Sequence, residues 1–443
     1  MKKIALTITI FFNMISFQTL AVSKNVMAPL QVKDFSKFDK ELKKIKELGA
    51  HAVSTDVWWG LIEKEDGKFD WSHYQKLSDI IISNGLQWVP ILSFHQCGGN
   101  VGDNCNIPIP SWLWNKYSHL DIAYKSEQGN TSREVISAYA TPYVISEYKD
   151  VFSSFKESFK NKIHNIQEIN ISLGPAGELR YPSYNSHDKN SGYPTRGSLQ
   201  SYSKLAIKSF QKYITNKYEN INNLNSAWGF GLKEFKQVFP PSPELFFPNN
   251  EQNSAYGRDF YDWYALSLRE HGRLILTEGI ATFREYGLAI GAKIPGIHWR
   301  MAYGADRLAE LNAGLINPRQ ELWNDDKGHG YSEMIKLFSG LKKSQNYNNL
   351  ILHFTCLEKD NGEQGSYAMS DAKSLVYRIG HLAKKEGVEI KGENALAGPM
   401  QSQRSWDNIQ DALIYGNYSG ITILRIGDVL KSHLSRDNFH KLH

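Results

Sequence analysis

The stretch QWVPILSFH, residues 87–95, is an apolar run that closes on a polar side chain, and this pattern decides the fold. Six further runs of the same kind occur along the chain, and each ends in polar or charged residues. They are HAVSTDVWW (51–59), IQEINISL (166–173), LAIGAKIPGIHW (288–299), NLILHFTCLE (349–358), VEIKGENAL (388–396) and GITILRIGD (420–428). Short apolar runs of this length predict buried β-strands.

Helical patterns lie between the runs. KFDKELKKIKELG (37–49) and YQKLSDIIISNG (74–85) have apolar residues at three-to-four spacing and a terminal glycine that suits a helix end. Alternating strands and helices predict an α/β protein with a parallel sheet. With an eighth strand expected in the poorly patterned stretch between the runs, the fold is a (β/α)8 TIM barrel with long loops at its C-terminal face. An open doubly wound sheet would have a glycine-rich phosphate turn where this chain has TDVWWG.

The composition is that of an ordinary globular protein. The chain has 443 residues, 41% hydrophobic and 22% charged, which is enough for one large barrel. A net charge of +5 without a long basic block argues against a nucleic-acid partner. The 11 Trp, 23 Tyr and 21 Phe suit either carbohydrate stacking or a large core.

The first 21 residues, MKKIALTITIFFNMISFQTLA, have the pattern of a signal peptide: two lysines, an apolar run and small residues before a cleavage site. A membrane anchor is the alternative, but polar residues interrupt the run well short of the ~20 apolar residues needed to span a bilayer. We therefore expect residues 22–443 to form one barrel domain that is secreted, to the periplasm or beyond the cell.

The turn GPAGELRYPSY (174–184) places one acid, Glu178, among glycine, proline and tyrosine residues. Hydrolysis of a glycosidic bond needs a protonated acid to donate to the leaving oxygen and a second carboxylate to activate water or to attack directly. The stiff turn fixes the acid, and Tyr181 and Tyr184 are placed to shield it from water. A helix-start glutamate that pairs with Arg180 is the alternative.

Two acids are candidates for the second carboxylate, because both follow an apolar run. Glu393 lies in KGENAL, after a glycine and beside Asn394, and Glu358 lies in FTCLEKD. A solvated surface acid is the alternative interpretation of Glu393. The residues alone do not choose between the two.

Asp56, in STDVWWG, is followed by Trp58 and Trp59. A carboxylate that accepts from sugar hydroxyls beside an indole that stacks on a ring face would form a sugar subsite, and capping of the next helix is the alternative. Four further polar residues lie at strand ends or in loops, with a packing role as the alternative for each histidine: His95, Asp103, Lys293 and His298.

The glycine-rich segment HQCGGNVGDNCNIPIPSW (95–112) is either a lid over a cleft or a static surface loop. Its Cys97 and Cys105 are eight positions apart in a flexible stretch, which allows a disulfide bridge in an oxidising compartment. Cys356 is left single. A zinc site would need more ligands than this segment supplies.

Six of these motifs, in this order, resemble the signatures of the β-amylases, glycoside hydrolase family 14, and of their bacterial members in particular. The resemblance extends from Asp56 to about Arg425. The motifs are DVWWG (56–60), HQCGGNVGD (95–103), GPAGELRYPSY (174–184), KIPGIHW (293–299), FTCLE (354–358) and GENAL (392–396).

The resemblance implies roles for individual residues. Glu178 would be the general acid and Glu393 the general base, whereas Glu358 would not be catalytic. The GGNVGD segment would be a mobile lid, and a shorter inner loop around Thr355 would shift with substrate. The implied substrate contacts are Asp56, His95, Asp103, Lys293, His298, Thr355, Asn394, Ala395 and Arg425.

The implied reaction is exo-acting, inverting hydrolysis of α-1,4-glucosidic bonds, which releases β-maltose from the non-reducing ends of starch, maltodextrin or a glycogen-like glucan. Inversion requires room for a water, so the two carboxyls should stand roughly 6.5–9.5 Å apart. No cofactor is required for catalysis. We expect a monomer that binds neither nucleic acid nor, once the signal peptide is removed, a membrane.

Some bacterial members of the family also bind a structural calcium ion. Glu63, Asp66, Glu147 and Asp150 fall in comparable places here, and calcium prefers oxygen ligands. Asp66 lies at a one-residue gap in the correspondence, and position 150 has Asp where Glu is expected. Solvated surface acids are the alternative interpretation.

Two other functions are compatible with such a barrel. A glucan-binding protein without turnover would need a missing acid or a broken lid, whereas both acids and the GGNVGD segment are intact. A retaining glycosidase would hold its carboxyls only about 5–5.5 Å apart.

Overall fold

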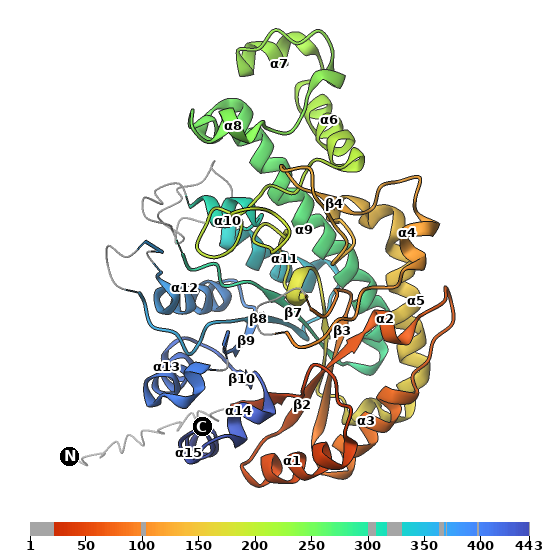
Figure 1. Cartoon of the computed structure of the whole chain (residues 1–443), viewed down its shortest axis with the longest axis vertical. Coiled ribbons are helices and arrows are strands. Elements are labelled where there is room, and N and C mark those ends of the chain that lie inside the picture. The colour runs from red at the N-terminus through yellow and green to blue at the C-terminus, as the bar shows by residue number, and fades with distance from the viewer. Residues whose placement is uncertain are drawn as a thin grey trace, which may run out of the picture.

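The structure is a computed structural model, and it describes residues 22–98, 103–299, 307–316, 330–362, 367–368, 370–396 and 398–442. The predicted signal peptide, residues 1–21, lies outside the described residues. Eight parallel strands close into one barrel (Figure 1), in the order β1-β10-β9-β8-β7-β6-β3-β2. They are β1 (Ser23–Met27), β2 (Ala52–Trp58), β3 (Gln87–Ser93), β6 (Glu168–Ile171), β7 (Ala289–Ile294), β8 (Leu350–Phe354), β9 (Glu389–Glu393) and β10 (Gly420–Ile423).

The barrel confirms the predicted TIM fold, but the eighth strand is not where the sequence pattern placed it. We expected it between the apolar runs, whereas β1 lies at the start of the barrel and pairs with both β2 and β10. Its five residues, SKNVM, begin with three polar side chains, so no apolar run marks the strand. Lys24 and Asn25 are buried in spite of their polarity, and the Asn25 amide donates to Gln167 Oε1 at 2.8 Å.

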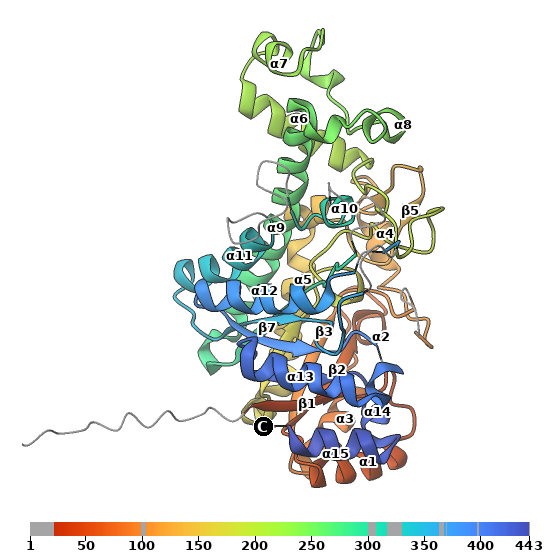
Figure 2. The ribbon, with the colours of Figure 1, turned by 90° about the vertical axis from the view of Figure 1, so that its left-hand side faces the viewer.

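Helices from the connecting segments surround the barrel (Figures 1 and 2). The main ones are α1 (Phe35–Glu47), α3 (Ser72–Ser83), α5 (Thr141–Phe159), α9 (Ala255–Phe283), α11 (Gly330–Ser344), α12 (Ala372–Lys385), α13 (Gln403–Tyr415), α14 (Ile426–Leu430) and α15 (His433–Lys441). Shorter helices, α2 (Trp59–Ile62), α4 (Trp112–Lys116) and α10 (Leu308–Asn312), lie in the loops that follow strands. In the described part of the chain, no helix combines the length and the apolar character needed to cross a membrane.

The two helices predicted from the sequence are present as α1 and α3, although each begins two residues before the expected start. Asp34 caps α1, because its carboxylate accepts from the Lys37 backbone N–H at 2.9 Å. The predicted terminal glycines, Gly49 and Gly85, lie just beyond the helices with φ of +85° and +66°. A residue without Cβ takes this left-handed conformation without strain, so each glycine allows the chain to leave its helix and enter the next strand.

A helical lobe rises from one end of the barrel, at the top of Figures 1 and 2. It contains α6 (Lys204–Tyr218), α7 (Ile221–Trp228) and α8 (Pro243–Phe246), and the long helix α9 leads from it back to the barrel. A two-stranded hairpin, β4 (Tyr124–Lys125) with β5 (Thr131–Ser132), belongs to the loop after β3. These insertions are the long loops predicted for the C-terminal face.

The aromatic residues mainly fill the core. Trp88, Trp263 and Trp406 are almost completely buried. Trp59 is only 1% exposed and makes edge contacts with Phe94. The sequence predicted that the indole of Trp58 or Trp59 stacks on a sugar. Trp59 does not fit this role, because its ring belongs to the core between the barrel and α5.

Candidate active site

Most of the predicted site residues lie at the C-terminal ends of the strands, as expected for a barrel of this class. Asp56, Lys293 and Glu393 are the last or nearly the last residues of β2, β7 and β9. The others follow their strands directly or lie in the loops beyond: His95, Asp103, Glu178, His298, Thr355, Asn394, Ala395 and Arg425.

Lys293 connects the predicted acids. Its ammonium pairs with Glu393 Oε2 at 2.5 Å. Burial by itself lowers the pKa of Lys293, but the carboxylates of Glu393, Glu178 and Asp56 outweigh burial, so its pKa is raised. The backbone of Glu178 also forms a bridge with that of Lys293. The structure thus brings three acids, one on β2, one on β9 and one in the loop after β6, around one cation.

The turn before Glu178 depends on glycine. A Cβ at Gly174 would collide with the backbone oxygens of Glu178 and Arg180, and Gly177 has φ +79°. Any other residue at either position would strain the turn. The two glycines of the motif therefore fix the backbone conformation of the turn that carries Glu178.

Two neighbours hold the Glu178 carboxylate. Arg180 Nε donates to Oε2 at 2.9 Å, and the Tyr184 hydroxyl approaches the same oxygen at 3.4 Å. The Arg180 guanidinium lies 4.0 Å from the centre of the Tyr184 ring. The contact with Tyr184 agrees with the sequence analysis. The pairing with Arg180 was expected for the alternative of a helix-start glutamate, but Glu178 follows a short 3-10 turn in an extended conformation and does not begin a helix. Tyr181 is different, because its ring stacks on Tyr264 and its hydroxyl donates to the Tyr264 carbonyl.

Asp56 is held at the end of β2 by two neighbours. The Ser93 hydroxyl donates to Oδ1 at 3.1 Å, and Arg425 Nη1 lies 3.9 Å from Oδ2. Burial raises the pKa of Asp56, and the positive charges of Arg425 and Lys293 oppose that rise. Asp56 and Arg425 come from opposite ends of the sequence and meet because β2 and β10 both flank β1.

The two site histidines are buried and neutral at ordinary pH. Burial, reinforced by Lys293 and Arg180, lowers the pKa of His95 to about 3, and its Nδ1 lies 2.8 Å from the Ser172 hydroxyl. Burial and Lys359 lower the pKa of His298 to about 4. His298 Nδ1 lies 2.7 Å from the Ser370 hydroxyl. Each histidine can therefore donate and accept hydrogen bonds without carrying charge.

Glu358 has a different environment from Glu393. Its carboxylate accepts the backbone N–H groups of Ala395 and Leu396 at 3.0 and 3.1 Å. Burial raises the pKa of Glu358, and these hydrogen bonds oppose the rise. Glu358 thus anchors the loop that follows Glu393.

Asn394 joins the ends of β9 and β10. Its amide accepts the Leu424 N–H at 2.8 Å and donates to the Leu424 carbonyl at 3.2 Å. Thr355, at the end of β8, lies against the turn after β7, where a Cβ on Gly296 would come within 3.2 Å of its methyl group. Both residues therefore connect neighbouring loops at the barrel mouth.

The predicted bridge between Cys97 and Cys105 is present. Asp103 lies inside the loop that this disulfide closes. The Oδ2 atom of Asp103 accepts the Gly98 N–H at 3.1 Å. Residues 99–102 of the predicted lid lie outside the described residues. The lid remains a prediction.

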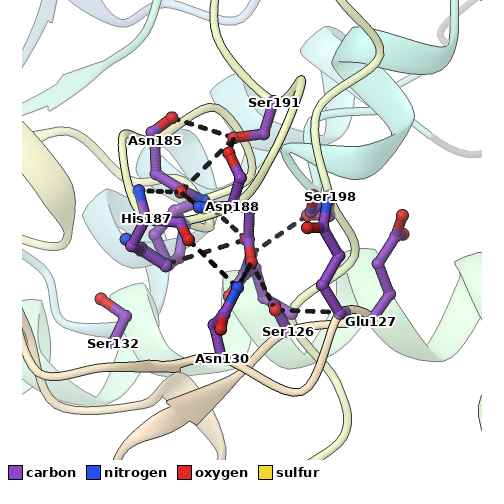
Figure 3. A network of polar contacts seen from close by, with 12 residues as sticks. Ser126, Glu127, Asn130, Ser132, Asn185, His187, Asp188, Ser191 and Ser198 are labelled. Carbon is purple, nitrogen blue, oxygen red and sulfur yellow. Dashed lines mark hydrogen bonds and ion pairs between the residues drawn. The ribbon is translucent and has the colours of Figure 1, made fainter.

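A buried polar network supports the long loop that continues from Glu178 (Figure 3). The Asp188 carboxylate accepts from the Ser126 hydroxyl at 2.7 Å and from the amides of Asn130 and Asn185 at 2.9 Å each. Burial acts to raise the pKa of Asp188, but these hydrogen bonds outweigh it, so the pKa is lowered. The network ties this loop to the β4–β5 hairpin.

The sequence analysis missed three ionisable residues inside the barrel. Glu168, His353 and Lys391 lie in β6, β8 and β9 and are 0%, 3% and 6% exposed. Each interrupts an apolar run. The sequence did contain a signal for them: an ionisable residue within an apolar run that otherwise predicts a buried strand. Such a residue needs a partner inside the protein.

The four predicted calcium ligands do not surround a common point. Asp150 is exposed on α5, one turn from the buried Glu147. Glu63 accepts the Trp59 indole N–H at 2.6 Å, and burial raises its pKa. Across the described residues, no group of three or more histidine, cysteine or acidic side chains is placed to hold a metal ion.

A lysine takes the place that a cation would need in this cluster. The Lys116 ammonium lies 2.8 Å from Asp66 Oδ2 and 3.1 Å from Glu147 Oε2. Burial acts to lower the pKa of Lys116, but the two carboxylates outweigh it and raise the pKa. These acids therefore do not fit a calcium site, since an ammonium group of the chain itself already lies between two of their carboxylates.

A closed α/β barrel with acids, a lysine and neutral histidines at its strand ends has the groups that a (β/α)8 glycoside hydrolase needs. The family model described as glycosyl hydrolase family 14 matches residues 25–440. The chain therefore belongs to glycosyl hydrolase family 14.

The chain is similar to the thermophilic β-amylase of Thermoanaerobacterium thermosulfurigenes, with 39% identity over 92% of this chain and 71% of that protein. It is 35% identical to the β-amylase of Bacillus cereus over 94% of this chain and 73% of that protein. The catalytic domain of the β-amylase from Paenibacillus polymyxa has a TM-score of 0.83 at 34% identity, covering 95% of this chain and 97% of that chain. A β-galactosidase from Marinomonas ef1, at 12% identity and a TM-score of 0.54, shares the fold alone.

Proposed function

We propose that the chain carries out the β-amylase reaction with Glu178 as general acid and Glu393 as general base. The β-amylase function follows from membership of the family and from 35–39% identity to bacterial β-amylases. The chain hydrolyses α-1,4-glucosidic bonds in starch and related glucans and releases β-maltose from non-reducing ends. The observation that carries the residue roles is the position of Lys293, paired with Glu393 and close to Glu178.

The contacts of the two carboxylates suit different roles. Both neighbours of Glu178 contact Oε2, so we assign the transferred proton to Oε1. Lys293 contacts Oε2 of Glu393, which leaves Oε1 to take the proton of a water. As Glu178 protonates the leaving oxygen and the glycosidic C–O bond breaks, the water attacks the anomeric carbon from the opposite face, and the configuration inverts. That the carboxyls stand roughly 6.5–9.5 Å apart stays a prediction.

The residues around these acids would bind the sugar. Asp56 and Arg425 form a paired donor and acceptor at the β2 and β10 ends, which suits neighbouring hydroxyl groups. The neutral histidines would exchange hydrogen bonds with hydroxyls without a charge to desolvate. The remaining contacts that we propose are Asp103, Lys293, Thr355, Asn394 and Ala395.

The substrate would be starch, maltodextrin or a glycogen-like glucan, and the enzyme a monomer. Residues 1–21 would direct its secretion, to the periplasm or to the medium. The disulfide between Cys97 and Cys105 supports an oxidising compartment, because such bonds persist there.

β-Amylases need no cofactor for the reaction, and the roles proposed above use only side chains and water. For the acidic cluster of Glu63, Asp66 and Glu147, we propose a structural role in which Lys116, not calcium, supplies the positive charge.

The decisive experiment follows the anomeric form of the product. Purified protein is incubated with soluble starch, and proton NMR records the first maltose released before mutarotation. We expect β-maltose. Initial α-maltose would indicate a retaining enzyme, and glucose or no product would overturn the proposal.

A further inference from the structure

The barrel holds a second cluster of ionisable side chains, below Glu393, to which the proposed reaction assigns no role. It consists of Glu168, His353 and Lys391, all nine-tenths buried or more. The strand register places His353 beside Lys391 on one side and beside Lys293 on the other. The cluster therefore lies in the layer of side chains directly beneath the predicted general base.

Glu168 holds this cluster together. Oε1 of its carboxylate contacts His353 Nε2, and Oε2 pairs with Lys391 at 2.7 Å. Burial acts to raise the pKa of Glu168, but His353 and Lys391 outweigh it and lower the pKa to about 2. A Cβ at Gly291 on β7 would collide with Glu168 Oε1, so this glycine provides the space for the carboxylate.

The position of one proton on His353 follows from this contact. Because the Glu168 carboxylate is ionised, Nε2 must carry the proton that it donates. Nδ1 lies 3.8 Å from Glu393 Oε1. Among the described residues, Nδ1 has no hydrogen-bond partner. A buried ring nitrogen without a partner is costly, and hydrogen bonds at catalytic groups often shorten only when substrate is bound.

We propose that His353 is a positioning residue that aligns Glu393 and accepts the proton that Glu393 takes from the attacking water. The inference rests on the role proposed for Glu393. In this step an O–H bond of the water breaks while its oxygen bonds to the anomeric carbon. The proton reaches Oε1 of Glu393 and then forms an N–H bond at Nδ1, and Glu393 is again a carboxylate.

In the described part of the barrel, four charged groups, two of each sign, surround the ring of His353. The charged groups that face His353 are Glu168 from β6, Lys293 from β7, and Lys391 and Glu393 from β9. The imidazolium formed would lie between two carboxylates. The two carboxylates are the charged groups that lie nearest the two ring nitrogens, Glu168 at Nε2 and Glu393 at Nδ1.

Two substitutions separate the two ring nitrogens. His353→Gln keeps an amide within reach of Glu168 and removes Nδ1, whereas His353→Asn keeps an amide near Nδ1 and removes the contact with Glu168. We expect kcat on maltodextrin to fall about 10–100-fold in both variants, with KM within about twofold, since outer-shell partners have effects of this size. His271→Gln is the matched control, because His271 is equally buried but contacts Thr141 and the Leu173 carbonyl.

Nitrogen NMR of histidine-labelled protein provides a readout without turnover. We expect the Nδ1 resonance of His353, assigned by its loss in His353→Gln, to shift in Glu393→Gln and to stay in place in Glu63→Gln. If neither His353 variant folds, the comparison of wild type with Glu393→Gln decides. The proposal would then be overturned if no histidine Nδ1 resonance shifts in Glu393→Gln.

The outcomes distinguish this inference from the proposed function. Wild-type kcat in both His353 variants, beside an inactive Glu393→Gln, would overturn the role of His353 and leave Glu393 as the base. An active Glu393→Gln would overturn the proposed function itself. A fall in kcat that His271→Gln shares would show a structural effect of a lost buried histidine, and it would also overturn the inference.

Discussion

Two lysines of this protein, Lys293 and Lys116, each lie between carboxylates, yet they occupy different kinds of place. Lys293 is on a barrel strand with its side chain 19% exposed, and it faces acids on two strands and in one loop. Lys116 ends the short helix α4 with its side chain 39% exposed, and it joins a loop to α5. Both lysines pair with carboxylates. The position of Lys293 at the strand ends is therefore what distinguishes the reactive site from the structural ion pairs of Lys116.

The largest effect should come from the acids around Lys293. We expect Glu178→Gln and Glu393→Gln each to lower kcat on maltodextrin by about 10²–10⁴-fold, because each removes one proton transfer from the reaction. Steady-state release of maltose measures this effect.

Glu244→Gln, on the exposed helix α8, is the control for the loss of one acid and should keep wild-type activity. Full activity in either active-site variant would mean that the acid concerned does not transfer a proton. Unchanged circular dichroism would show that a loss of activity is not a loss of fold.

The next effect separates the two lysines directly. Lys293→Met should lower kcat/KM by about 10–100-fold, since it leaves Glu393 without its paired cation. Lys116→Met should leave kcat/KM unchanged and lower the free energy of unfolding by about 1–3 kcal/mol, because solvent screens its pair with the half-exposed Asp66 but not its pair with the buried Glu147. Kinetics and urea unfolding of both variants provide the measurement. Equal effects on kcat/KM would remove the distinction between the two places.

The acid dependence of stability should also separate the barrel mouth from the surface. Burial lowers the pKa of His95 to about 3 and that of His298 to about 4, below the usual value of 6.5. Between about pH 6.5 and pH 4 the unfolded chain binds protons that the folded chain does not, so stability is complete above pH 6.5 and is lost as the pH falls.

His298→Gln should reduce that loss by on the order of 2 kcal/mol between pH 6.5 and pH 4. Urea unfolding at the two pH values measures it. The exposed His164, exchanged for Gln, serves as the control and should leave the slope unchanged. An unaltered slope in His298→Gln would show that His298 binds its proton equally in both states.

The barrel could be predicted from sequence because seven of its strands combine an apolar run with a polar end, and the order of strands and helices then admits few folds. β1 was not predicted, because its residues Ser23, Lys24 and Asn25 are polar. Their buried polar groups form hydrogen bonds that only the closed barrel creates. Tertiary partners outweighed the local pattern there.

The site shows the same limit at the level of side chains. Strand ends gave the positions of Asp56, Lys293 and Glu393, but the residues alone did not separate Glu393 from Glu358. What differs is the partner, an ammonium for Glu393 and two backbone N–H groups for Glu358. Such partners come from elements distant in sequence.

The smallest effect concerns calcium and tests whether Lys116 takes the place of a metal ion. We expect the melting temperature of the wild type to differ by less than about 1 °C between excess EDTA and millimolar CaCl2, because Asp66 and Glu147 already share an ammonium. In Lys116→Met those carboxylates lose their cation, so added calcium should raise the melting temperature by a few degrees. Lys68→Met is the control, since Lys68 pairs with the exposed Glu65 and, within the described part of the chain, does not lie between two carboxylates. A wild-type melting temperature that rises with calcium would mean that the ion displaces Lys116, and Lys116 would then be a replaceable counter-charge.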